Sequence, residues 1–400
     1  MNTNTKKELK NITLRKADRC VKCGLCSAQC PTYLLEGSEN ESPRGRVSLA
    51  QAIASNQIFE HQLVSHHIDS CLSCRRCEKI CPSGVEVSQI VANTRNILNV
   101  EGRNSVRNLL VKLSARATYN DWKKISGLFH TLKRTGFFRL FPKLAPIREY
   151  INPALNINPR ITDDQTAETI FLFAGCASQI LDQATIKDSQ ELLGLCGYLV
   201  SIPDKQVCCG ALPHHKGLLE TAKQCETTNL RAFKHEQIPV IFLATACGGA
   251  LKAYKDEGFC NRTSNITTFL NTQGVLDKFD FKPANKRILV HEPCTEKNVL
   301  KIHGEVEKLL SHLPNTEVIT LKETTGCCGA AGDYMINQPD IANNIRNPLI
   351  TEIKAINPDI IVTSNYTCGM HIQNGLLEKN LDIEVIHPIR LLLRYLIINT

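Results

Sequence analysis

The sequence contains no apolar run long enough to cross a membrane. Its longest apolar stretches are short or interrupted by polar and charged side chains: Ile170–Ala174, Val240–Ala246 and Ile386–Ile398. A spanning helix needs about 20 consecutive apolar residues, so none is predicted. The first ten residues are polar and basic with no apolar segment behind them, which argues against a secretory signal peptide. We therefore expect the protein in the cytoplasm, either free or peripheral on the cytoplasmic face of the inner membrane.

Patterns for nucleotide binding and for acid–base catalysis are also missing. No G-x-G-x-x-G run follows a strand pattern and no P-loop is present, so no flavin or other nucleotide is expected on this chain. The sequence offers no acid–base constellation, and no catalytic residue is assigned. His214, His215 and His291 are expected to be solvated or packed.

Aromatic residues are scarce, at 6% of the chain, while positive charge is concentrated at the front. Residues 1–150 carry 24 Lys and Arg against 12 Asp and Glu, and the remainder carries 23 against 27. A basic front half could contact an acidic partner protein, anionic lipid headgroups or nucleic acid. Because the basic residues are scattered and lack interleaved aromatic platforms, nucleic acid is not expected as a partner.

Cysteine, in contrast, is abundant, with 19 residues. The number is odd, and disulfides do not persist in a reducing compartment. Metal ligation by thiolates is therefore the simplest explanation of so many cysteines. Eight of them form two runs of the pattern C-x2-C-x2-C-x3-C-P, the first ending at Cys30-Pro31 and the second at Cys81-Pro82. In this ferredoxin-type spacing three cysteines bind one 4Fe–4S cluster and the fourth binds the neighbouring cluster. Cluster 1 is therefore assigned to Cys20, Cys23, Cys26 and Cys81. Cluster 2 is assigned to Cys71, Cys74, Cys77 and Cys30.

Zinc is a poorer explanation of these runs, because structural zinc sites use pairs of cysteines rather than four within eleven residues followed by proline. Between the runs, Val47–Ile53 has helical periodicity, so the clusters are expected among helices. Gly24 is expected to let the backbone pass close to inorganic sulfide. For Arg44 and Arg46 we favour pairing with surface carboxylates; the alternative is that they offset cluster charge and raise the reduction potential.

The segment Asn104–Lys143 has apolar residues at helical spacing with basic residues on the other side. We favour a helical hairpin that packs on the cluster domain. The alternative is an amphipathic surface that lies on a membrane or docks a partner. The proline-rich stretch Pro142–Pro159 is interpreted as a linker.

After residue 165 the sequence contains an internal repeat of strands, helices and cysteines. Cys176, Cys208-Cys209-Gly210 and Cys247 return as Cys294, Cys327-Cys328-Gly329 and Cys368, at offsets of 118, 119 and 121 residues. Even Pro239 returns as Pro358. This regularity predicts two equivalent α/β units with cysteines at strand-to-helix turns, where ligand sites form.

Two further metal or redox sites are predicted from the repeat. The candidate ligands in the first unit are Cys176, Cys208, Cys209 and Cys247. Those in the second are Cys294, Cys327, Cys328, Cys368 and His371. Cys196, Cys225 and Cys260 have no counterpart and are interpreted as core or incidental residues.

The predicted fold class is α+β with several domains. Residues 1–100 form a helical ferredoxin-type domain with two cubane clusters, and residues 101–165 a helical and proline-rich linker. Residues 166–285 and 286–400 form two tandem α/β Cys-Cys-Gly repeat domains.

This order of parts resembles the family that includes the iron–sulfur subunits of glycolate oxidase and anaerobic glycerol-3-phosphate dehydrogenase, a lactate-utilisation protein and a heterodisulfide reductase subunit. The resemblance to the glycolate oxidase subunit is supported by four stretches: Cys30–Tyr33, Pro43–Arg46, Gly304–Lys308 and Cys327–Gly332. It implies that a separate FAD-binding dehydrogenase subunit oxidises glycolate to glyoxylate. This chain would relay the electrons towards a quinone or another membrane acceptor.

The chain departs from the heterodisulfide reductase pattern, in which each module resembles C…CCG…C-x2-C. Ala250 stands at the fifth position of the first repeat and His371 at that of the second. Further iron–sulfur species, zinc or redox-active thiols remain alternatives for the two repeats. The alternative functions are a heterodisulfide-reductase-like thiol/disulfide redox subunit, an iron–sulfur subunit for lactate or glycerol-3-phosphate oxidation, and a non-enzymatic redox sensor or assembly protein.

Overall fold

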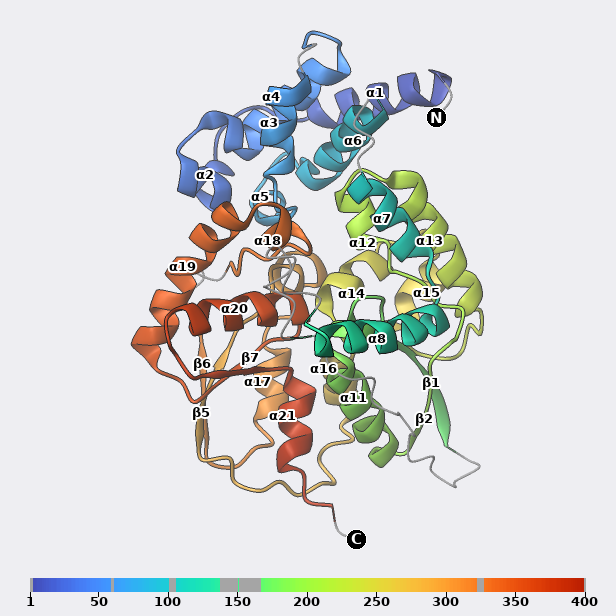
Figure 1. The fold of residues 1–400 in the computed structure, drawn as a ribbon, viewed down its shortest axis with the longest axis vertical. Helices are drawn as coiled ribbons and strands as arrows, with labels where there is room; N and C mark the ends of the chain where they lie inside the picture. Colours follow the sequence, from blue (N-terminus) through green and yellow to red (C-terminus); the bar gives the residue numbers. More distant parts are fainter. Residues whose placement is uncertain are drawn as a thin grey trace.

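The computed structural model describes residues 3–58, 61–100, 106–136, 150, 167–321 and 327–398. A helical N-terminal region lies at one end of the molecule, and two α/β units lie below it (Figure 1). Within the described residues, no helix is long and apolar enough to cross a membrane.

The N-terminal region consists of helices around a small apolar core. Three of its helices contribute fully buried Ile53, Ile68 and Ile90 to one apolar cluster. The start of α3 is fixed by Ser42, whose hydroxyl accepts from the Gly45 amide, and by Pro43 at the first helical position. The elements are α1 (Thr3–Ala17), η1 (Ser27–Gln29), α2 (Pro31–Glu36), η2 (Glu39–Glu41), α3 (Pro43–Ala54), α4 (His61–Asp69), α5 (Arg76–Lys79) and α6 (Val87–Val100).

The first α/β unit, called the first repeat below, contains a parallel sheet of strand order β2-β1-β3-β4. Its central strands are buried on both faces by helices, as continuous apolar runs such as that in β1 require. The strands are β1 (Glu168–Phe173), β2 (Tyr198–Ser201), β3 (Val240–Phe242) and β4 (Thr263–Asn265). The helices are α10 (Ser178–Leu181), α11 (Gln183–Leu195), α12 (Ala211–His215), α13 (Leu219–Ala232), α14 (Thr245–Leu251), α15 (Glu257–Arg262) and α16 (Ile266–Gln273).

The second α/β unit, the second repeat, has the same strand order in its parallel sheet, β6-β5-β7-β8. The strands are β5 (Lys286–Val290), β6 (Thr316–Thr320), β7 (Ile360–Val362) and β8 (Glu384–Ile386). The helices are the π-helix η5 (Glu296–Leu300), α17 (Glu305–Leu310), α18 (Tyr334–Asn337), α19 (Pro339–Ile356), α20 (Tyr366–Glu378) and α21 (Pro388–Tyr395). The predicted fold class, a helical region followed by two α/β repeats, is confirmed.

One apolar core joins the two repeats. Leu172 of β1 and Ile288 of β5 belong to the same buried cluster, together with Leu392 of α21. Helix α21 packs on α11 of the first repeat, and α16 packs on α17 of the second. The two repeats therefore share part of their interior, although each also has an apolar cluster of its own.

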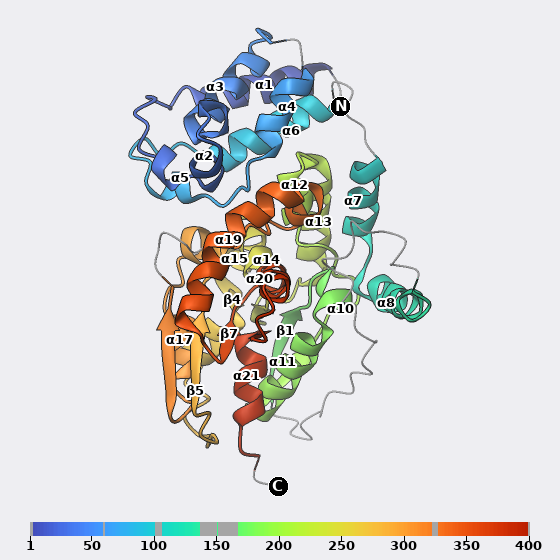
Figure 2. The same cartoon turned by 60° about the vertical axis from the view of Figure 1, so that its left-hand side comes forward.

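The region between residues 101 and 165 differs from the prediction. Helices α7 (Val106–Arg116) and α8 (Tyr119–Arg134) form, but they pack mainly on the first repeat, and α7 reaches the N-terminal region through the Asn108–Asn99 hydrogen bond. Helix α8 lies against α10, and α7 lies against α12 and α13 (Figure 2). The favoured interpretation is also wrong for α7 in a second respect, because its apolar face is exposed. The predicted linker Pro142–Pro159 lies outside the described residues apart from Tyr150.

Candidate iron–sulfur and thiol sites

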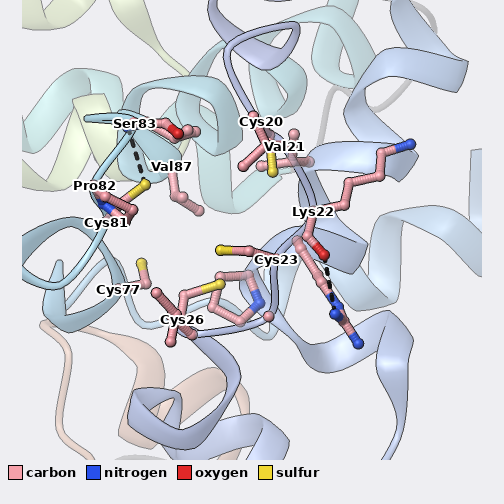
Figure 3. A pocket seen from close by; sticks show the side chains of 16 residues that line it. Cys20, Val21, Lys22, Cys23, Cys26, Cys77, Cys81, Pro82, Ser83 and Val87 are labelled. Carbon is pink, nitrogen blue, oxygen red and sulfur yellow. Dashed lines mark hydrogen bonds between the residues drawn. The ribbon is translucent and has the colours of Figure 1, made fainter.

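The four cysteines assigned to cluster 1 line a single cavity in the helical region. Cys77 of the other set also reaches its wall, and the five labelled sulfurs in Figure 3 point into the same space. Burial, with added repulsion from Cys20 and Cys23, raises the pKa of Cys26. Converging thiols around one cavity fit the ligand set of a cubane cluster, in which each thiolate binds a different iron.

A second cavity is lined by the four cysteines assigned to cluster 2: Cys30, Cys71, Cys74 and Cys77. Because Cys77 lines both cavities, the two lie next to one another. The spacing argument thus groups the eight cysteines as the cavities do, and the ligation itself stays a prediction.

The two cysteine loops have the same backbone geometry. Lys22 and Gly24 in the first loop, and Ser73 and Arg75 in the second, all have positive φ, at 57°, 87°, 52° and 60°. These are the second and fourth residues after the first cysteine of each run, so the two loops curl alike. Glycine suits the positive φ of Gly24, and an added Cβ would lie 2.6 Å from the guanidinium of Arg44, which would have to move.

Arg46 lines the second cavity and is buried, with only 1% of its surface exposed. Its Nη1 donates to Cys30 Sγ at 3.6 Å, and its Nη2 donates to Thr32 Oγ1 at 2.9 Å. Thr32 Oγ1 in turn lies 3.2 Å from the same sulfur. A buried cation next to a ligand sulfur favours the more negative, reduced form of a cluster and so raises its potential.

The charge of Arg46 is balanced by Glu41, with which it forms a buried ion pair. Burial would raise the pKa of Glu41, but hydrogen bonds from His67 and Ser70 and the charge of Arg46 hold it below its ordinary value. Arg46 therefore pairs with a carboxylate as favoured, but with a buried one rather than one at the surface, and its effect on a reduction potential stays a prediction.

Arg44 matches the favoured surface role. It pairs with Glu39, donating from Nε to Oε1 at 2.6 Å, and its Nη1 donates to the Lys22 carbonyl at 3.1 Å. Its guanidinium thus braces the first cysteine loop from outside.

In both repeats the cysteines follow the carboxyl ends of strands, the usual edge for a ligand site in a parallel sheet. In the first repeat the thiol of Cys208 lies beside those of Cys176 and Cys209, and the thiol of Cys209 lies beside that of Cys247. All four predicted residues are thus brought together. An added Cβ at Gly175 would lie 3.7 Å from Cys247 Sγ, which shows how closely the loop after β1 approaches this set.

In the second repeat Cys328 hydrogen-bonds with Cys368, and burial with repulsion from Cys327 and Cys328 raises the pKa of Cys294 to about 12. The side chain of Asn365 donates to Cys368 Sγ at 3.2 Å. These four cysteines also gather at one sheet edge.

His371, the fifth candidate of the second repeat, is buried. Burial, followed by the charge of Arg346, lowers its pKa to about 4, while a hydrogen bond with the Ala342 carbonyl opposes the shift. No hydrogen bond from its ring to a cysteine occurs among the described residues. Its role as a ligand stays a prediction.

Two residues next to the first repeat's cysteines were missed by sequence reasoning. Cys225, set aside as a core residue, is buried in α13 and hydrogen-bonds with Cys208, which lowers the pKa of Cys225. Tyr366 belongs to the second repeat, yet burial and the neighbouring Cys176 and Cys247 raise its pKa well above the ordinary value. Only the three-dimensional packing of the repeats reveals these positions, because neither residue belongs to a repeated motif.

Within the described part of the chain, no three His, Cys, Asp or Glu side chains converge closely enough to hold a single metal ion. The thiolates of a 4Fe–4S cluster each bind a separate iron, so they stand further apart than the ligands of one ion.

The second cysteine loop, residues 71–77, lies in contact with the second repeat. Burial, with repulsion from Cys294 and Cys327, raises the pKa of Cys74 well above its ordinary value. The side chain of Asn298 in η5 donates to the Cys74 carbonyl at 2.9 Å, and Tyr334 Oη donates to the Ser70 carbonyl at 3.0 Å. The first repeat touches the helical region elsewhere, through α12 and α6.

Comparisons with known proteins agree with this architecture. Residues 16–85 match the 4Fe-4S dicluster domain family, and residues 170–252 and 288–373 each match the Cysteine-rich domain family. The chain is 27% identical to a probable glycolate oxidase iron–sulfur subunit of Bacillus subtilis, covering 97% of this chain and 98% of the relative. Identity is also 27% to the glycolate oxidase iron–sulfur subunit of Escherichia coli, over 89% of each chain. Lactate utilization protein A 2 of Bacillus cereus is 26% identical over 54% of this chain and 95% of that protein.

Proposed function

We infer that this chain, in which a 4Fe-4S dicluster domain is joined to two copies of the Cysteine-rich domain, is the iron–sulfur subunit of an oxidoreductase complex. The observation that carries the inference is the grouping of eight cysteines around two adjacent cavities. Bound clusters would supply one-electron acceptors and donors. The residues of this chain would hold the clusters, set their potentials and fix their order.

Cys20, Cys23, Cys26 and Cys81 would hold cluster 1. Cys71, Cys74, Cys77 and Cys30 would hold cluster 2. Arg46 would raise the potential of cluster 2 through its hydrogen bond to Cys30, and Glu41 would keep that guanidinium buried and oriented. Cluster 2 would thereby attract electrons that enter at cluster 1.

The order of sites that we propose runs from cluster 1 to cluster 2, then to the second repeat and finally to the first. The shared wall at Cys77 supports the first step. The proximity of Cys74 to Cys294 and Cys327 supports the second. Tyr366, which follows β7 of the second repeat and packs beside Cys176 and Cys247, supports the third. The proposed order does not depend on whether each repeat holds an iron–sulfur cluster, a zinc ion or free thiols.

The substrate that we propose for the complex is glycolate, oxidised to glyoxylate by an FAD-binding partner subunit. The similarity to glycolate oxidase subunits over nearly the whole chain supports this choice over lactate or glycerol-3-phosphate. We propose a quinone or another membrane acceptor as the destination of the electrons. The working location would then be the cytoplasmic face of the inner membrane.

The test is anaerobic purification of the chain alone and together with its flavoprotein partner. About eight irons with matching sulfide are expected from two cubanes, and more if the repeats also hold clusters. Glycolate should reduce the clusters only when the flavoprotein is present. Colourless, iron-free protein would overturn the inference, and reduction by lactate or glycerol-3-phosphate but not glycolate would overturn the proposed substrate.

A further inference from the structure

Helix α7 turns its apolar side away from the protein. Val106, Leu109, Leu110 and Leu113 recur at the spacing of one helical face and are 74%, 55%, 59% and 57% exposed. The opposite face carries Ala115, which is buried, and packs on α12 and α13. A helix of a globular protein ordinarily buries its apolar stripe, so this orientation calls for a partner.

Basic side chains flank this stripe. At 100° per residue, Arg107 and Lys112 fall on opposite sides of the exposed leucines, and Arg116 falls beside Lys112. From Val106 to Arg134 the two helices contain seven Lys and Arg residues and a single acidic residue, Asp121. Leu128 of α8 is also 59% exposed.

The basic character extends to α1, which contains five Lys and Arg residues and one acid, Glu8. The start of α1, α7 and α8 lie along the same side of the molecule in both views (Figures 1 and 2). An apolar stripe with Lys and Arg at its flanks is the pattern of a helix that lies in the interface of an anionic bilayer. The leucines would enter the acyl boundary and the basic groups would face lipid phosphates.

We propose that the apolar face of α7 and its flanking basic residues form a surface that binds anionic phospholipid membranes. This proposal rests on the proposed transfer of electrons to a membrane acceptor. It identifies α7 as the part of the chain that holds the protein at the bilayer. The same helix ends beside the first repeat's cysteines, since the Cys208 amide donates to the Ala115 carbonyl at 3.3 Å. Membrane binding through α7 would therefore place the last site of the proposed relay near the lipid surface.

The test is co-sedimentation of the purified chain with vesicles of phosphatidylcholine, with and without phosphatidylglycerol. Binding is expected with the anionic vesicles and should weaken as salt rises. The double variant Leu109→Gln with Leu113→Gln should bind at least about tenfold more weakly, because apolar burial is lost. Leu377→Gln, on an equally exposed leucine of α20, is the matched control and should bind like the unchanged protein.

Iron content and thermal unfolding, measured on the same samples, should be equal for all these variants, since the changed side chains are exposed. Failure of the unchanged chain to bind anionic vesicles, or equal binding by the double variant, would overturn the proposal. Loss of flavoprotein co-purification in the double variant without loss of vesicle binding would show a protein interface instead, and would also overturn it. Because vesicle binding needs no electron transfer, either result leaves the proposed redox function to be judged by the iron count.

Discussion

The two repeats share a fold but differ in what surrounds their cysteines. Strand order is the same, and the Cys-Cys-Gly turn ends on a glycine with positive φ in each, Gly210 at 86° and Gly329 at 73°. Yet the second repeat contacts the second cysteine loop at Cys74, whereas the first contacts the helical region through α12 and α6. Duplication therefore reproduces the local geometry of the cysteines. The way each repeat packs on the helical region sets its position in the proposed electron relay.

The largest difference is expected when matched cysteines are changed. Cys294→Ser in the second repeat should stop electrons from substrate-reduced clusters reaching either repeat, a loss of at least about tenfold in rate. Cys176→Ser at the same position of the first repeat should leave the second repeat reducible. Low-temperature paramagnetic resonance of the complex, reduced by substrate without an acceptor, counts the reduced centres. Equal effects of the two changes would break the proposed order.

The contact between the second repeat and cluster 2 also depends on the buried Arg46 network, because Tyr334 binds the carbonyl of Ser70, a member of that network. Arg46→Gln leaves Glu41 buried without its cation and should lower the free energy of unfolding by about 3–5 kcal/mol. It should also lower the potential of cluster 2, measured by redox titration. Arg44→Gln is the matched control at the surface and should leave the potential of cluster 2 unchanged. A potential unaffected by Arg46→Gln would rule out the tuning role.

Replacing Gly210 or Gly329 by alanine should lower the free energy of unfolding by different amounts in the two repeats. Each change places a side chain at positive φ, which costs about 1–2 kcal/mol. In Gly329→Ala the new Cβ would also lie 2.4 Å from the Ala342 carbonyl oxygen, against 3.2 Å from that of Ala222 in Gly210→Ala. We expect a total loss of about 3 kcal/mol or more for Gly329→Ala, since the helix backbone must shift. Denaturant unfolding with a larger loss for Gly210→Ala would contradict this.

The smallest expected effect is a pH dependence carried by the first repeat. Burial, opposed by Thr185 and Arg390, raises the pKa of Asp182 to about 7, whereas Leu300 stands at the matching position 118 residues on. The folded state therefore holds this proton more tightly than the unfolded chain, and stability declines as pH rises from about 4 to 7. Asp182→Asn should raise the free energy of unfolding at pH 8 by about 1 kcal/mol and change little at pH 4.5. The exposed Asp340→Asn is the control, and an equal gain at both pH values would exclude Asp182 as the source.

Spacing in the sequence was sufficient to predict the eight cysteines of the helical region as two groups, because their ligand pattern is local. The 118–121-residue offsets likewise predicted the two α/β units, since strands, helices and cysteines return together. What spacing could not predict were contacts between units. Cys225 reaches Cys208 from α13, and Tyr366 reaches the other repeat's cysteines, through packing that has no sequence period. The orientation of α7 was mispredicted for the same reason: an amphipathic pattern identifies a stripe but does not say whether protein or solvent lies beside it.

The apolar cluster shared by the repeats constrains the order in which this chain can fold. Leu392 of α21 lies in the same apolar cluster as Leu172 of β1, so the first repeat completes its interior only after the second has been synthesised. The helical region has an apolar cluster of its own, but Leu72 and Cys74 also pack in the apolar cluster of the second repeat. The helices of the N-terminal region can thus pack before the repeats are synthesised, whereas the loop around Cys74 gains its last contacts from the second repeat.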